Sequence, residues 1–133
     1  MKLLLDAHAL LWFLADDPQL SATARAALMD PANERWLSPI SLVEIALKVR
    51  LGKLPLSAPF GVLFPAQLAA NRVQLYSLEP RHIEPLTTLP FHHKDPFDRL
   101  LVAQAVAGKL ALVTPDQAIR NYPEVDCVWK LNA

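Results

Sequence analysis

Four acidic residues occupy places where a folding chain would normally avoid charge. Each one lies where an apolar element begins or ends: Asp6, Glu44, Asp98 and Asp116. Two unit charges about 4 Å apart repel by about 4 kcal/mol at an effective dielectric of 20, so a cluster of carboxylates needs protons or cations. An all-oxygen cluster suits hard divalent ions such as Mg²⁺ and Mn²⁺ rather than zinc. If the four side chains meet, the chemistry they support is divalent metal binding.

Asp98 lies in a segment, residues 95–105, that predicts a helix. Asp95 followed by Pro96 is typical of a helix start. Asp98 then shares one helical face with three apolar residues, Leu101, Val102 and Ala105. Because a buried, unpaired carboxylate is strongly disfavoured, Asp98 must lie at the rim of a cleft, be protonated or meet a cation. Asp95 competes for this role, but we interpret Asp95 as the cap and Asp98 as the inward group.

The other three carboxylates each allow an ordinary structural role. Glu44 precedes Lys48 by one helical turn, and such a surface pair contributes only about 0.3 to 0.5 kcal/mol. Asp116 could cap or charge the first turn of a helix, and Asp6 could cap a loop. Asp6 is the hardest to dismiss, because an acid directly after three leucines at a strand end cannot be a core residue.

The elements that must position these residues alternate between strands and helices. Strands are predicted at 3–5, 36–37, 73–78, 110–113 and near 128, and helices at 9–15, 21–29, 38–51, 59–71, 80–88, 95–108 and 115–121. This order predicts an α/β fold with a mostly parallel sheet of four to five strands, covered on both faces. Ligands bind outside the carboxyl ends of such strands, where Asp6, Ser38 and Thr114 follow three different strands.

Length and composition favour one compact domain over residues 1–133, with 53% hydrophobic residues to form its core. The 13 basic and 13 acidic side chains cancel, so nucleic-acid binding would depend on a local basic patch, a dimer groove or bound metal. A single cysteine, Cys127, excludes an internal disulfide. Asp6 and His8 interrupt the apolar start, which argues against a secretory signal, and we expect a cytoplasmic location.

Several short segments, spread over nearly the whole chain, form a specific pattern. They are Leu5-Asp6-Ala7-His8, Leu11-Trp12, Glu44-Ile45-Ala46 with Lys48, Gly52-Lys53-Leu54, His93-Lys94-Asp95, the run from Asp95 to Ala105, and Val113-Thr114-Pro115-Asp116. Together they resemble the PIN domain family, and more narrowly the VapC-type toxins of type II toxin–antitoxin pairs. The resemblance implies a three-layer α/β/α PIN-like fold. The family's acidic residues fall on Asp6, Glu44, Asp98 and Asp116.

The resemblance also implies a function. It predicts a metal-dependent endoribonuclease that uses Mg²⁺, with Mn²⁺ as a substitute, and that cleaves RNA with a metal-activated water. The four carboxylates would be its catalytic residues and metal ligands. A cognate antitoxin protein would neutralise the enzyme, and homodimers are usual. Positive charge for the RNA backbone could come from four residues that could also be ordinary surface: His92, His93, Lys94 and Arg99.

One departure from the family pattern lies next to the first Asp. Related proteins usually carry Thr or Ser there, whereas Ala7 has no hydroxyl. Ser38, Ser41 and Thr114 could supply hydrogen bonds around the metal ligands, as could Asp95, although the hydroxyls could equally cap helices or strands.

A second function from a different class stays open. The chain could be a catalytically silent PIN-like module that binds a partner protein through an apolar surface containing Trp12 and Phe13. Stabilisation by Mn²⁺ would distinguish the two, because a silent module should show none.

Overall fold

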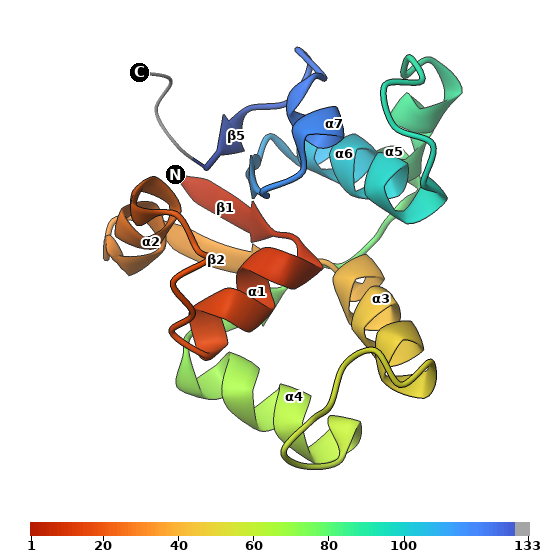
Figure 1. Ribbon diagram of the computed structural model, residues 1–133. Coiled ribbons are helices and arrows are strands. Elements are labelled where there is room, and N and C mark those ends of the chain that lie inside the picture. The colour runs from red at the N-terminus through yellow and green to blue at the C-terminus, as the bar shows by residue number, and fades with distance from the viewer. Residues whose placement is uncertain (130–133) are drawn as a thin grey trace.

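The computed structural model describes residues 1–129. The last four residues of the predicted domain, 130–133, lie outside the described residues. Five parallel strands form one sheet in the order β3-β2-β1-β4-β5 (Figure 1). Their bounds are β1 Lys2–Leu5, β2 Glu34–Leu37, β3 Val73–Leu75, β4 Ala111–Val113 and β5 Cys127–Val128.

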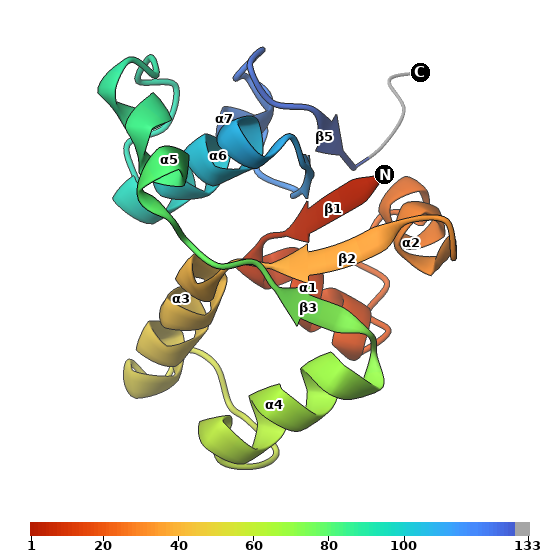
Figure 2. The same cartoon turned by 180° about the vertical axis from the view of Figure 1, so that it is seen from behind.

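Helices cover both faces of this sheet. Their bounds are α1 Ala7–Leu14, α2 Ala22–Met29, α3 Pro39–Arg50, α4 Phe60–Ala70, α5 Pro80–Ile83, the 3₁₀ turn Glu84–Thr87, α6 Pro96–Gly108 and α7 Gln117–Arg120. Figures 1 and 2 show α5, α6 and α7 on one side of β1, with α1, α3 and α4 on the other. The predicted three-layer α/β/α fold with a parallel sheet is therefore confirmed.

The leucines of β1 show why both faces are apolar. Successive side chains of a strand point to opposite faces of the sheet. Leu3 and Leu5 are buried in one hydrophobic cluster together with residues of α1 to α4. Leu4 is buried in a second cluster with residues of α6 and α7. A central strand of a parallel sheet therefore reads as a continuous apolar run, and charge first becomes tolerable where the strand ends.

Three predicted elements differ in detail. The third strand is shorter than predicted, and the helix predicted at 80–88 is divided into α5 and the 3₁₀ turn, where Pro85 lacks a backbone donor. Gly108, predicted as the helix stop, is the last residue of α6, while Lys109 adopts the left-handed conformation with φ of 58°. A Cβ at Gly108 would overlap the Tyr76 hydroxyl and a methyl group of Leu110, so any larger residue there would displace these side chains.

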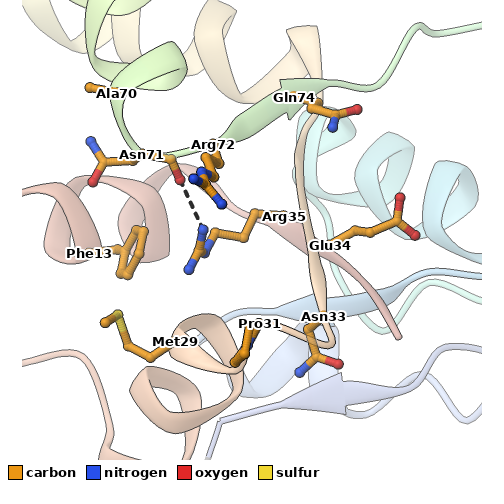
Figure 3. Close-up of a pocket in the computed structure, with 10 residues that line it drawn as sticks. All are labelled: Phe13, Met29, Pro31, Asn33, Glu34, Arg35, Ala70, Asn71, Arg72 and Gln74. Atoms are coloured by element: carbon orange, nitrogen blue, oxygen red, sulfur yellow. Dashed lines mark hydrogen bonds between the residues drawn. The ribbon is translucent and has the colours of Figure 1, made fainter.

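A pocket of about 480 Å³ lies at the amino ends of β2 and β3 (Figure 3). Arg35 donates from Nε to the Leu28 carbonyl at 2.6 Å and from Nη1 to the Asn71 carbonyl at 3.0 Å. Its guanidinium also stacks over the Phe13 ring at 5.3 Å. Because those carbonyls belong to the ends of α2 and α4, Arg35 fastens two helix ends to the sheet.

No helix within residues 1–129 has both the length and the apolar character needed to cross a membrane.

Candidate active site

The carboxyl ends of three neighbouring strands bring polar residues together. In the sheet, β1 lies between β2 and β4, and Leu5 is paired with Leu37 on one side and with Val113 on the other. The next residue along each strand is Asp6, Ser38 or Thr114 respectively. All three are buried. Sheet register therefore places these three side chains next to one another at one edge.

Asp6 is held by both of its carboxyl oxygens. Oδ1 accepts a hydrogen bond from the Ala9 amide at 2.7 Å, which caps α1, and Oδ2 accepts one from the Thr114 hydroxyl at 2.5 Å. Burial raises the pKa of Asp6 to about 7; the two hydrogen bonds oppose this shift, and the charges of Glu44 and Asp98 add to it. Capping and membership of an acidic cluster are therefore compatible roles for this residue.

His93 connects two of the other carboxylates. Its Nδ1 accepts a hydrogen bond from the Asp95 amide at 3.0 Å, so Nε2 carries the proton of the neutral ring. Nε2 donates to Asp116 Oδ2 at 2.9 Å and lies 3.1 Å from Asp98 Oδ2. The backbone amide of His93 donates to the Tyr122 hydroxyl at 3.1 Å. We expected this ring at the RNA backbone, but it turns inward and holds two carboxylates together.

The pKa values of these two carboxyls are shifted in opposite directions. Burial raises the pKa of Asp98 to about 6; the charges of Glu44 and Asp95 add to the shift, whereas His93 opposes it. Burial would also raise the pKa of Asp116, but hydrogen bonds from His93 and from backbone amides outweigh it and lower that pKa. Separated pKa values in neighbouring carboxyls are typical of functional sites.

The cap assignments follow from which oxygens are used. Asp95 Oδ1 accepts from the Phe97 amide at 2.8 Å and from the Asp98 amide at 3.4 Å, which confirms Asp95 as the cap of α6. Asp116 caps α7 through Oδ1, which accepts from the amides of the second and third residues after it. Its Oδ2 is the atom that meets His93. One oxygen of Asp116 thus serves the fold while the other faces the cluster.

Glu44 has both a salt-bridge partner and acidic neighbours. Lys48 Nζ lies 3.5 Å from Glu44 Oε2, one helical turn away on α3. The same Nζ lies 3.2 Å from His8 Nε2. Glu44 nevertheless raises the pKa of both Asp6 and Asp98, so its carboxylate lies within electrostatic reach of both. The pairing with Lys48 and a place beside the cluster therefore coexist.

His8 is a neighbour of the cluster that the sequence did not single out. Burial and the charge of Lys48 lower its pKa, whereas Glu44 and Asp116 oppose that change. These influences place His8 between acidic and basic groups at the edge of the cluster. Its position in the first turn of the helix capped by Asp6 was the available signal.

The predicted hydroxyls divide into two groups. Thr114 donates to Asp6 and also accepts from the Asp116 amide at 3.1 Å, so it connects two members of the cluster. Ser38 instead caps α3 by accepting from a backbone amide, and Ser41 donates to the Leu5 carbonyl at 3.4 Å. Of the two roles predicted for these hydroxyls, Thr114 thus has the carboxylate contact, Ser38 has the capping role, and Ser41 bonds to the end of β1.

Arg99 has a different task from the phosphate contact that we expected. It is 8% exposed, and its guanidinium donates to the Pro90 carbonyl at 2.8 Å, to the Leu89 carbonyl at 3.3 Å and to the Tyr122 hydroxyl at 3.2 Å. The arginine thus shapes the loop before α6. A sequence pattern cannot reveal this role, because an arginine on a helix looks the same whether it faces solvent or an adjoining loop.

The donor set fits a divalent cation. One oxygen each of Asp98 and Asp116 lies within 4.8 Å of the other and of His93 Nε2, whose proton bonds to the carboxylates rather than leaving Nε2 free as a ligand. Asp6 and Glu44 add carboxylates whose charges influence this group. Oxygen-rich sets of this kind suit Mg²⁺ or Mn²⁺. A cation among them would also relieve the repulsion that helps to raise the pKa values of Asp6 and Asp98.

Comparisons with known proteins agree over nearly the full length. Residues 3–125 match the PIN domain. Ribonuclease VapC22 of Mycobacterium tuberculosis is 32% identical over 129 residues, which cover 95% of this chain and 97% of that protein.

Two solved structures share the fold. VapBC2 from Rickettsia felis, bound to a DNA fragment from its promoter, matches with a TM-score of 0.71 and 17% identity, covering 96% of this chain and 97% of the other. DNA-bound VapBC from Salmonella typhimurium matches with a TM-score of 0.69 and 15% identity, covering 96% of each chain. Because the PIN domain match covers residues 3–125, which is most of the sequence, the chain belongs to the PIN domain family.

Proposed function

We propose that this chain is a metal-dependent endoribonuclease and the toxin of a toxin–antitoxin pair. Asp6, Glu44, Asp98 and Asp116 would hold Mg²⁺ or Mn²⁺. The proposal is carried by one observation: carboxylates gather at the carboxyl edge of the sheet. There, burial and the charges of neighbouring carboxylates raise the pKa values of Asp6 and Asp98. The 32% identity to a protein named as a ribonuclease supports RNA as the substrate.

The chain's own residues hold the carboxylates in fixed positions. The Ala9 amide and the Thr114 hydroxyl fix Asp6, while His93 fixes Asp98 and Asp116 relative to each other. Ligands that are already oriented need no rearrangement during the reaction. Such preorganisation is a main source of the rate enhancement in sites of this kind. A bound Mg²⁺ or Mn²⁺ supplies the chemistry of acidifying a water and neutralising charge on phosphate oxygens.

The loop before α6 would supply positive charge to the RNA. His92 and Lys94 are exposed on either side of His93. Contacts from such residues to phosphate oxygens position a nucleic acid without reading its sequence. The neutral overall charge of the chain is consistent with binding through a local patch.

Metal-dependent cleavage of RNA tests the proposal directly. Protein stripped with EDTA should cut single-stranded RNA only after addition of Mn²⁺ or Mg²⁺. Asp6→Asn and Asp98→Asn keep the size of each side chain but remove its charge, and both should abolish cleavage. Asp30→Asn is the matched control, because Asp30 is exposed and accepts only a local hydrogen bond from the Ala32 amide. Undiminished cutting by both site variants would refute the assignment.

The two aromatics named for the alternative, a silent binding module, are both partly covered by other side chains. Trp12 is half-buried and packs between His8 at 5.5 Å and Trp129 at 5.9 Å. Phe13 is likewise half-buried and lies under the Arg35 guanidinium. Both aromatics thus serve the fold. A thermal shift on addition of Mn²⁺ to the stripped protein, absent in Asp98→Asn, would exclude a silent module.

An antitoxin and a second copy of the chain are further parts of the proposal. Similar solved structures are described as VapBC assemblies, which supports a protein partner. Val43 and Leu47 on α3 and Leu51 at its C-cap recur at one-turn intervals and are exposed, as expected of a surface that a partner covers. Co-expression with the product of a neighbouring short reading frame would test antitoxin binding. Light scattering on the purified protein would then give the number of copies of the chain in the assembly. We place the complex in the cytoplasm, where its RNA substrate would be.

A further inference from the structure

Phe91 exposes its ring more than any other large hydrophobic side chain in residues 1–129. Its exposed fraction is 82%. A single exposed apolar residue is ordinary in soluble proteins and by itself indicates nothing. What distinguishes Phe91 is how its ring is held and where in the fold it lies.

One face of the Phe91 ring rests on a fixed cation. The Arg99 Cζ lies 4.0 Å from the ring centroid. Arg99 is itself buried and held by hydrogen bonds to the Pro90 and Leu89 carbonyls and to the Tyr122 hydroxyl. Cation–π contacts of this kind restrain an aromatic ring. The contact favours this orientation of the Phe91 ring, and the surface it leaves open is the side away from Arg99.

Phe91 belongs to the same loop as a neighbour of the acidic cluster. His93, two residues further along, donates to Asp116 and lies 3.1 Å from Asp98. Two residues of chain span at most about 7 Å, so the backbone of Phe91 lies within about 7 Å of the backbone of the residue whose ring holds those two carboxylates. Exposed Lys94 brings a cation to the same loop, and exposed His92 adds an imidazole ring. An aromatic ring that shares a loop with cations, near the proposed nuclease centre, matches the composition of surfaces that bind single-stranded nucleic acid.

We propose that Phe91 is a stacking platform for one unpaired base of the RNA strand, adjoining the nucleotide whose phosphate lies at the acidic cluster. The inference rests on the proposed function for its choice of RNA as ligand. A base offers a planar face to the open side of the ring, and its phosphates meet the neighbouring cations. Bases that are splayed out of a strand are commonly bound on aromatic and arginine planes. A protein partner would instead favour a continuous apolar surface, which His92 and Lys94 interrupt.

Direct binding of RNA, measured without metal, tests the platform. The probe is a fluorescein-labelled, mixed-sequence single-stranded RNA, and its anisotropy is measured in EDTA at low salt. Phe91→Ala should weaken binding by about 5-fold to about 150-fold, the range found for the loss of one base–aromatic stack. Phe91→Leu keeps an apolar side chain but no plane and should be nearly as weak, whereas Phe91→Trp should keep the affinity of the wild type. Val62→Ala, at an exposed position on α4, is the control and should change nothing.

Abasic substitution identifies the stacked nucleotide. An abasic site moved along the RNA should weaken wild-type binding at one position, and Phe91→Ala should lose nothing further with that RNA, because both changes remove the same contact. Unchanged binding by Phe91→Ala, equal binding by the Leu and wild-type proteins, or no RNA binding by the wild type would each overturn the proposal. Equal binding by Leu would point to an apolar protein contact. Binding is measured without metal, so this test is separate from the cleavage assay. If Asp98→Asn loses cleavage while Phe91→Ala keeps full RNA affinity, the proposed nuclease function stands and the stacking platform is refuted.

Discussion

Asp6→Asn should make the metal-free protein more stable relative to wild type as the pH rises. Burial raises the pKa of Asp6 from its usual 3.8 to about 7 in the folded chain. Between these two values the folded state keeps a proton that the unfolded state has lost. The stability linked to that proton is fully present below pH 4 and is lost as the pH rises through 7.

The magnitude follows from the two pKa values. Linkage predicts that the buried carboxyl destabilises the wild type by about 2 kcal/mol at pH 5 and about 4 kcal/mol at pH 8, compared with a carboxyl that titrates alike in both states. Asparagine cannot ionise, yet its oxygen can accept from the Ala9 amide while its nitrogen donates to the Thr114 hydroxyl. The free energy of unfolding of Asp6→Asn minus that of wild type should therefore increase by about 2 to 3 kcal/mol from pH 5 to pH 8.

Urea denaturation followed by far-UV circular dichroism measures this difference. Both proteins are unfolded at pH 5 and at pH 8 with EDTA present, and equal m-values show that the compactness of the unfolded state has not changed. Asp30→Asn, exposed and bonded only to the Ala32 amide, serves as the control and should differ from wild type equally at both pH values. A difference between Asp6→Asn and wild type that stays constant or shrinks with rising pH would refute the assignment of a buried, proton-binding Asp6.

Substitutions at three further positions test the packing, the cap and the charge pair. Gly108→Ala should lower the free energy of unfolding by about 1 to 3 kcal/mol in urea denaturation, because its methyl group would overlap Tyr76; wild-type stability would show that Tyr76 moves aside. Asp95→Ala should cost about 1 kcal/mol by the same method, whereas Asp95→Asn should cost only a few tenths, and equal losses would contradict the capping role. Lys48→Met should change stability by less than about 1 kcal/mol and tighten Mn²⁺ binding in calorimetric titration, because a cation leaves the side of Glu44; weaker binding would exclude that arrangement.

Local patterns predicted the elements because they depend on neighbouring residues alone. The Asp95-Pro96 start of α6, the Ser38-Pro39 start of α3 and the apolar run before Asp6 are each short-range signals, and the structure contains the corresponding elements. The predicted length of the third strand was too great. Tyr76-Ser77-Leu78 continues the sequence pattern of a strand, but the pairing of β3 with β2 ends at Leu75. Strand length depends on a partner that lies distant in sequence.

The roles of individual side chains needed the packed structure. Arg99 and His93 both read as cations for RNA, but one is buried under a loop and the other bridges two carboxylates. Which way such a side chain turns depends on residues that meet it from elsewhere in the chain, here Tyr122 for Arg99 and Asp116 for His93. Glu44 is a similar case, since its partner Lys48 was predictable from helical spacing while its influence on Asp6 was not.

The sequence alone determined that carboxylates end apolar elements, that strands alternate with helices, and that the chain resembles PIN domains. These properties follow from hydrophobic periodicity and capping, which act within a few residues. Tertiary structure decided that Asp6 and Thr114 share a hydrogen bond across more than a hundred residues, that His93 holds Asp98 beside Asp116, and that Arg99 presents Phe91 to solvent. Those contacts arise only when sheet register and helix packing bring distant segments together, because the energy of each depends on the position of both partners.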